Sequence, residues 1–130
     1  MRAALDELEG STFVRQEIPW TAEEFQKFTG RCHVPQRRLL ARLLDAGANE
    51  WVEDSELRKV LGFSDNVALS GSLSGISKVA RMFGIEPRRV YSQNTVYRHG
   101  ESQRTYQVTT EFQKAARRHG WPAADDLKYR

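Results

Sequence analysis

The sequence has one cysteine, Cys32, and no run of apolar residues near the roughly 18–20 that cross a membrane. A single cysteine excludes an intrachain disulfide and a four-thiolate metal site. The first residues, MRAALDELEGST, lack the apolar core of a secretory signal. We therefore expect a protein of a reducing, cytoplasmic compartment that has no membrane partner.

Signatures of catalysis and of metal binding are missing as well. Cys32 and His33 are adjacent, whereas His99 and His119 lie far along the chain, so the spacing of a structural zinc site is absent. The segment 71–75, Gly-Ser-Leu-Ser-Gly, is not followed by the Gly-Lys-Ser/Thr of a phosphate loop. The sequence also lacks kinase, hydrolase and dinucleotide motifs. We predict a protein that is not an enzyme and holds neither a metal nor a cofactor.

What the sequence does have is the composition of one globular domain: 130 residues, of which 39% are hydrophobic and 28% are charged. Its charges are segregated. Residues 1–35 carry four basic and six acidic side chains, whereas residues 77–119 carry nine basic and three acidic ones. Either the second half forms a polyanion-binding face, or its arginines and lysines only keep exposed strands and helices soluble.

Local signals predict one helix in the first 34 residues. A frayed helix over residues 1–9 and an extended segment over residues 11–18 are expected to precede it. Thr21 and Glu24 have the spacing of a capping box, which places the start of the helix at residue 21. Gly30 is expected to end it.

Three further helices are expected from residue 35 onward. The first begins near Pro35, a favoured residue at a helix start. The second begins at residue 54 or 55, after a single strand bridge at residues 51–52, and ends at Gly62. The third spans residues 66–83 and has one apolar stripe. That stripe consists of Leu69, Leu73, Ile76, Ala80 and Phe83.

The hydrophobic pattern then changes its period. Residues 89–97 and 104–109 are rich in Val, Tyr and Thr, and they flank the turn sequence His99-Gly-Glu-Ser102. This pattern predicts a β-hairpin. Thr110 and Gln113 have the spacing of a second capping box, which predicts a short basic helix over residues 110–119. Residues 120–130 are expected to form a loose tail. Without the hairpin, the protein would be a small helical bundle.

This order of elements resembles the winged helix–turn–helix family over residues 35–119. The resemblance rests on the order itself, on the Gly-containing turn before the longer helix and on the hairpin directly after that helix. It implies an α+β, mostly helical fold, in which a three-helix core carries a β-hairpin wing. Residues 1–34 would be an N-terminal extension with a helix at about 21–30, and a C-terminal helix would follow the wing. The resemblance also implies that helix 66–83 enters the major groove of double-stranded DNA, and that the wing contacts the backbone or the minor groove.

The side of helix 66–83 opposite the apolar stripe would then meet the DNA. Lys78 and Arg81 suit phosphates, and the small residues before them let DNA approach closely. Apart from Asn66, this face lacks the Asn, Gln or early Arg that read bases, so we expect modest direct readout from it. The predicted contacts on this helix are Asn66, Ser70, Gly71, Ser74, Ser77, Lys78 and Arg81.

The two glycines of this helix, Gly71 and Gly75, have two interpretations. Each costs about 1 kcal/mol relative to alanine in a helix, which indicates that something approaches closely. The approaching surface is either DNA, which we favour, or another helix.

The hairpin and its flanks supply the remaining predicted contacts. An arginine at a wing tip suits the electronegative minor groove of A·T-rich DNA, although arginine also protects strand edges. Tyr91, Tyr97 and Tyr106 either stack on bases or pack the hairpin onto the core, which is the preferred interpretation. The predicted contacts here are Arg88, Arg89, Arg98, His99 and Arg104.

Two functions remain open at this point. The first is sequence- or shape-selective binding of double-stranded DNA, as a regulator of transcription, with a homodimer formed through the N-terminal extension or the last helix. The second is a protein-interaction or DNA-recognition module of a larger assembly, such as a nuclease or defence complex, without chemistry of its own. In that case the Gly/Ser face of helix 66–83 would dock a partner helix.

Overall fold

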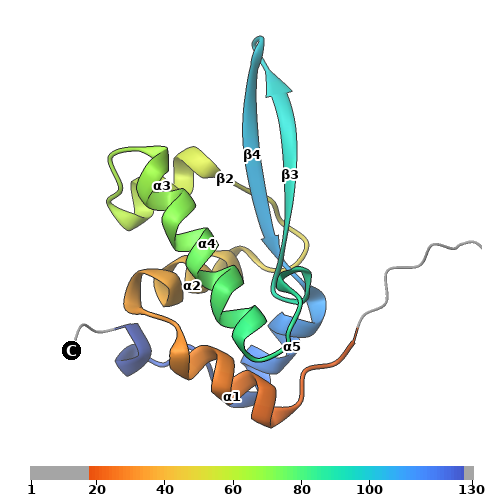
Figure 1. The fold of residues 1–130 in the computed structure, drawn as a ribbon. Coiled ribbons are helices and arrows are strands. Elements are labelled where there is room, and N and C mark those ends of the chain that lie inside the picture. The colour runs from red at the N-terminus through yellow and green to blue at the C-terminus, as the bar shows by residue number, and fades with distance from the viewer. Residues whose placement is uncertain (1–17, 128–130) are drawn as a thin grey trace, which may run out of the picture.

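A computed structural model describes residues 18–127, which form an α+β fold of helices and one small antiparallel sheet, whose β3–β4 hairpin projects beyond the helices (Figure 1). The segments considered at residues 1–9 and 11–17 lie outside this range. The helices are α1 (Ala22–Arg31), α2 (Val34–Ala46), α3 (Asp54–Leu61), α4 (Asn66–Met82) and α5 (Thr110–His119), with 3₁₀ turns η1 (Pro87–Arg89) and η2 (Ala124–Leu127). The strands β2 (Val52–Glu53), β3 (Tyr91–Arg98) and β4 (Glu101–Val108) lie in the order β2-β4-β3.

The helix starts and ends follow local capping chemistry. The predicted capping box of α1 is present: Thr21 Oγ1 accepts from Glu24 N at 3.1 Å, and Thr21 N donates to Glu24 Oε1 at 3.1 Å. The prediction that Gly30 ends this helix is wrong: Gly30 keeps a negative φ, and α1 continues to Arg31. Gly62 ends α3 in the left-handed conformation, with φ of 73°.

The hairpin has a tighter turn than the four residues that the sequence indicated. The two turn residues are His99, with φ of 56°, and Gly100, with φ of 80°. Two positive φ values in succession are typical of the type I′ turn, whose twist matches that of the strands. Glu101 and Ser102 therefore belong to β4, and Arg98 pairs with Glu101.

The C-terminal part differs from expectation in two places. The cap of α5 is Thr109, one residue earlier than predicted, and its Oγ1 accepts from Phe112 N at 3.1 Å. Gln113 is not part of a capping box, since its Oε1 accepts from Ala48 N at 3.0 Å. The expected loose tail is ordered up to residue 127. There η2 packs on α2, and Arg38 Nε donates to Leu127 O at 3.2 Å.

One core unites the described residues across the expected boundary at residue 35. Trp20, Phe25 and Phe28, from the expected N-terminal extension, are 3%, 1% and 0% exposed. All three rings contact Phe112 of α5, with centroids 5.3, 5.4 and 6.0 Å from its centroid. These side chains cover the core and are not available to a second copy of the chain. No helix within residues 18–127 has the length and hydrophobicity to cross a bilayer.

Candidate nucleic-acid interface

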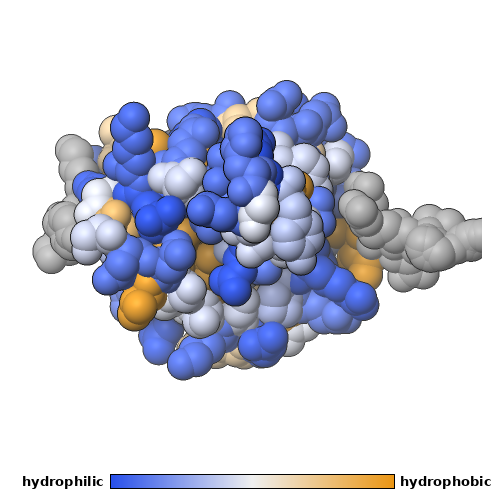
Figure 2. Space-filling view, turned by 90° about the horizontal axis from the view of Figure 1, so that it is seen from above, coloured by the Kyte–Doolittle hydropathy of each residue, from blue (hydrophilic) through white to orange (hydrophobic). Residues whose placement is uncertain are grey.

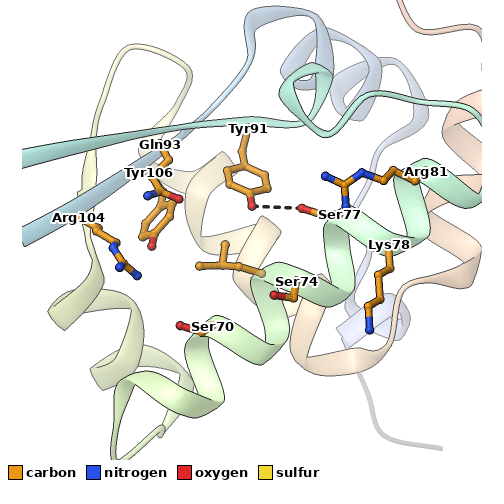
Figure 3. Close-up of a pocket in the computed structure, with 10 residues that line it drawn as sticks. Ser70, Ser74, Ser77, Lys78, Arg81, Tyr91, Gln93, Arg104 and Tyr106 are labelled. Atoms are coloured by element: carbon orange, nitrogen blue, oxygen red, sulfur yellow. Dashed lines mark hydrogen bonds between the residues drawn. The ribbon is translucent and has the colours of Figure 1, made fainter.

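A polar groove runs between α4 and the hairpin, which projects beyond the helices (Figures 1 and 3). One part of it is a cavity of about 380 Å³ beside the base of the hairpin, and a second cavity of about 400 Å³ lies nearer the hairpin tip. Arg104 lines both cavities. The first is lined by Ser70, Leu73, Ser74, Ser77, Lys78, Arg81, Tyr91, Gln93, Arg104 and Tyr106. The second is lined by Asp54, Asn66, Thr95, Tyr97, Ser102 and Arg104.

One face of the hairpin forms a wall of this groove. Successive side chains of a strand point to opposite faces, so the groove receives every second residue of β3 and β4. The cross-strand pairs Gln93–Tyr106, Thr95–Arg104 and Tyr97–Ser102 all line one of the two cavities. Asn94 and Arg98 therefore lie on the other face.

The α4 wall carries the side chains that the sequence predicted for it. Ser70, Ser74, Lys78 and Arg81 are exposed and line the groove. Ser77 is half-buried, and its hydroxyl lies 3.5 Å from that of Tyr91. In Figure 3 Arg81 turns back toward Ser77, whereas Lys78 extends away from the hairpin.

The two glycines of α4 have different surroundings. A methyl group added at Gly71 would meet nothing within 4 Å, so this position is open to solvent. One added at Gly75 would lie 2.1 Å from Nε2 of Gln36 on α2. The buried side chain of Gln36 thus fills the space beside Gly75, whereas Gly71 stays available to an outside partner.

The charge of the groove is mostly positive. Lys78, Arg81 and Arg104 have no carboxylate partner at ion-pair distance within the described part of the chain. Asp54 is the acidic residue of the second cavity. Burial raises the pKa of Tyr106, against the lowering effect of the nearby Arg104, so its phenol is a neutral hydrogen-bond donor at neutral pH.

Arg89, predicted as a DNA contact, is instead held inside the fold. Its guanidinium donates to Glu24 at 3.1 and 3.2 Å and to Pro19 O at 3.2 Å, and lies 4.9 Å from the Trp20 ring centroid. Its carbonyl accepts from Trp20 Nε1 at 3.1 Å and from Thr109 Oγ1 at 2.7 Å. We call Trp20, Glu24, Arg89 and Thr109 the hairpin clamp. The other three residues hold Arg89, which lies just before the start of β3 and thus at the base of the hairpin.

The other predicted wing residues lie outside the groove. Arg98 pairs with Glu53 of β2 at 2.7 Å, and Arg88 pairs with Glu86 at 2.9 Å. His99 is exposed at the turn. Of the five residues predicted for the wing and its flanks, only Arg104 lines the groove together with residues of α4.

The sequence interpretation missed groove residues on the hairpin. Gln93, Thr95 and Ser102 were not singled out, although they share a strand face with Arg104. Strict alternation counted from Arg104 would have found them. Among the tyrosines, Tyr106 packs in the core as favoured, whereas Tyr97 is 81% exposed at the outer end of the groove.

The face that carries the hairpin tip is largely hydrophilic, with isolated hydrophobic side chains (Figure 2). Such a surface suits a polar or charged partner better than an apolar one. Comparison of the chain with known protein families, with characterised proteins and with solved structures found no match.

Proposed function

We propose that this chain binds double-stranded DNA through the groove between α4 and the hairpin, and that it acts as a regulator of transcription. The observation that carries the proposal is a set of three cations, Lys78, Arg81 and Arg104, on the two walls of one groove, none of which has a carboxylate partner within residues 18–127. Serine hydroxyls lie between them. Cations and hydroxyl groups are the side-chain groups that contact DNA phosphates.

The order of elements supports a winged helix–turn–helix architecture for residues 34–119. Helix α2, strand β2, helices α3 and α4 and the hairpin follow one another, and β2 pairs with β4. In this proposal α4 is the helix after the turn, and the hairpin is the wing. A regulatory role follows from that resemblance, whereas DNA binding is also supported by the charge of the groove.

Two observations favour DNA over a partner helix on α4. The contact with Gln36 inside the chain already accounts for Gly75, so the small-residue face is narrower than the sequence indicated. The exposed side of α4 over the groove carries Ser70, Ser74, Lys78 and Arg81, which are polar or charged. A docked helix would need apolar contacts there.

The test is fluorescence anisotropy of a labelled random-sequence duplex at three salt concentrations. We expect dissociation constants near ~10⁻⁴–10⁻⁶ M that weaken steeply with salt, because phosphate contacts release counterions. The double variant Lys78→Ala/Arg81→Ala should bind every duplex more weakly and reduce the salt slope by about two.

The matched control is Lys27→Ala/Arg117→Ala, which removes two positive charges from α1 and α5, away from the groove. It should retain most of the binding and the salt slope. Absence of binding at low salt, or equal losses in both double variants, would refute the proposed groove.

A further inference from the structure

We infer that the hairpin wall of the groove, and not α4, reads the DNA sequence, and that Gln93 and Arg104 are its specificity-determining residues. This inference rests on the proposed function and concerns the same groove. It assigns the two walls different tasks: α4 holds the DNA backbone, and the hairpin face meets the base edges.

The α4 wall is poorly equipped to distinguish bases. Its groove-lining polar residues before Lys78 are Ser70, Ser74 and Ser77, with Asn66 at the first position of the helix. A serine hydroxyl both donates and accepts, so it discriminates weakly among base pairs. Lys78 and Arg81 lie in the second half of the helix, where they extend the charged surface toward phosphates.

The hairpin wall carries the two side chains that discriminate best. Glutamine contacts adenine in a bidentate manner, and arginine does the same with guanine, in the major groove. Gln93 and Arg104 are exposed and line the same cavity. The part of the chain that the structure describes offers no carboxylate to Arg104, and the side chain of Gln93 has no partner there.

The register fixes the spacing of this pair. Gln93 is opposite Tyr106, and Arg104 is opposite Thr95, so the two residues are diagonal neighbours on one face. Diagonal neighbours in an antiparallel pair lie about 7–8 Å apart. Since successive bases rise by about 3.4 Å, the two side chains match an adenine and a guanine about two base pairs apart.

The shape of the hairpin is compatible with this task. The major groove is about 12 Å wide and admits either an α-helix or a two-stranded β-ribbon. The eight-residue strands of β3 and β4 project from the helical body, and none of the helices within residues 18–127 covers their outer half (Figure 1). The small serine side chains of α4 leave the opposite wall open to a sugar-phosphate strand.

The experiment selects preferred sites from a randomised duplex library with the full chain, and then measures affinities for the selected site and its single-base variants. Gln93→Ala should lose preference at one adenine, and Arg104→Lys should lose preference at one guanine about two pairs away. Each loss should be roughly 5- to 150-fold in discrimination. Arg104→Lys keeps the charge, so the salt slope should not change.

Two controls separate readout from general contact. Asn94→Ala removes an exposed amide from the opposite hairpin face and should leave the preferred site unchanged. Ser70→Ala/Ser74→Ala should weaken binding to all sites without altering the preference. Equal melting temperatures would show that each variant is folded.

Three results would overturn the inference. If the serine variant or Asn66→Ala changes the preferred site while Gln93→Ala and Arg104→Lys do not, α4 is the reading element. If the wild-type chain binds duplexes in a salt-dependent manner but selects no sequence, the inference fails while the proposed function stands. If the chain binds no duplex at low salt, or prefers single strands or RNA, both fail.

Discussion

The base of the hairpin and the groove above it use the same residue type for different purposes. Arg89 at the base has a side chain that is 16% exposed and donates to Glu24 and to the carbonyl of Pro19. Arg104 in the groove is exposed and has no carboxylate partner within residues 18–127. Whether an arginine can contact an outside ligand therefore depends on the partners that the fold gives it.

The largest expected effect distinguishes these two arginines directly. Arg89→Ala should lower the free energy of unfolding by about 2 kcal/mol, since it removes a two-point contact to a carboxylate that is only partly exposed. Arg104→Ala should change it by less than about 0.5 kcal/mol. Urea unfolding followed by circular dichroism measures both. Equal losses of unfolding free energy in the two variants would show that Arg89 is no more structural than Arg104.

The glycines of α4 extend the comparison to a second residue type. Gly71→Ala should stabilise the chain by up to about 1 kcal/mol, because alanine is the better helix former and nothing lies near the new methyl group. Gly75→Ala should be less stable than Gly71→Ala by about 1 kcal/mol or more. The buried Gln36 would have to move, and its Oε1 accepts from His33 N at 2.8 Å.

Thermal or urea unfolding of the two alanine variants side by side gives this difference. If Gly75→Ala is as stable as Gly71→Ala, then Gln36 moves aside without cost. In that case the contact between α2 and α4 does not require a glycine.

The smallest expected effect concerns Glu24, the carboxylate of the hairpin clamp, and the dependence of stability on pH. The hydrogen bonds from Arg89 hold the pKa of Glu24 below its ordinary value of 4.5. A lowered pKa in the folded state contributes stability above 4.5, and this contribution is lost as the pH falls through the lower, folded value. Glu24→Gln should therefore flatten the decline of stability on acidification.

Urea midpoints measured across this acidic range give the slope for each chain. Arg89→Ala should flatten the same slope, because the hydrogen bond from Arg89 is the largest cause of the lowered pKa of Glu24. Glu23→Gln is the matched control, because Glu23 pairs with Lys27 on the exposed side of the same helix. A slope unchanged in Glu24→Gln would contradict this account.

The parts of the fold that depend on local chemistry could be predicted from the sequence. The capping box at Thr21, the stop at Gly62 and the start of α4 all involve residues a few positions apart. The faces of the hairpin were also within reach, because alternation fixes them. The register was not, since a four-residue turn would have moved each pairing by two residues from the observed Arg98–Glu101 pair.

The fate of the individual arginines could not be predicted, because it depends on distant partners. Arg89 and Glu24 are 65 positions apart, and no local pattern links them. Arg98 pairs with Glu53 of the short strand β2, which was expected at residues 51–52 and lies one residue later, so the expected strand did not include this partner. The sequence thus predicted the basic character of this region, whereas only the fold separates the paired cations from the unpaired ones.

The hairpin clamp also bears on the order in which the chain can fold during its synthesis. Trp20 is synthesised before its hydrogen-bond partners Arg89 and Arg118, which follow 69 and 98 residues later. Its ring also waits for Phe112 of α5. The aromatic side chains at α1 therefore lack their contacts to Phe112 until α5 has been translated, and the core is complete only then. Such sequence-distant contacts slow folding relative to local ones, so α1 must stay soluble until α5 emerges, a requirement that its Glu and Lys residues help to meet.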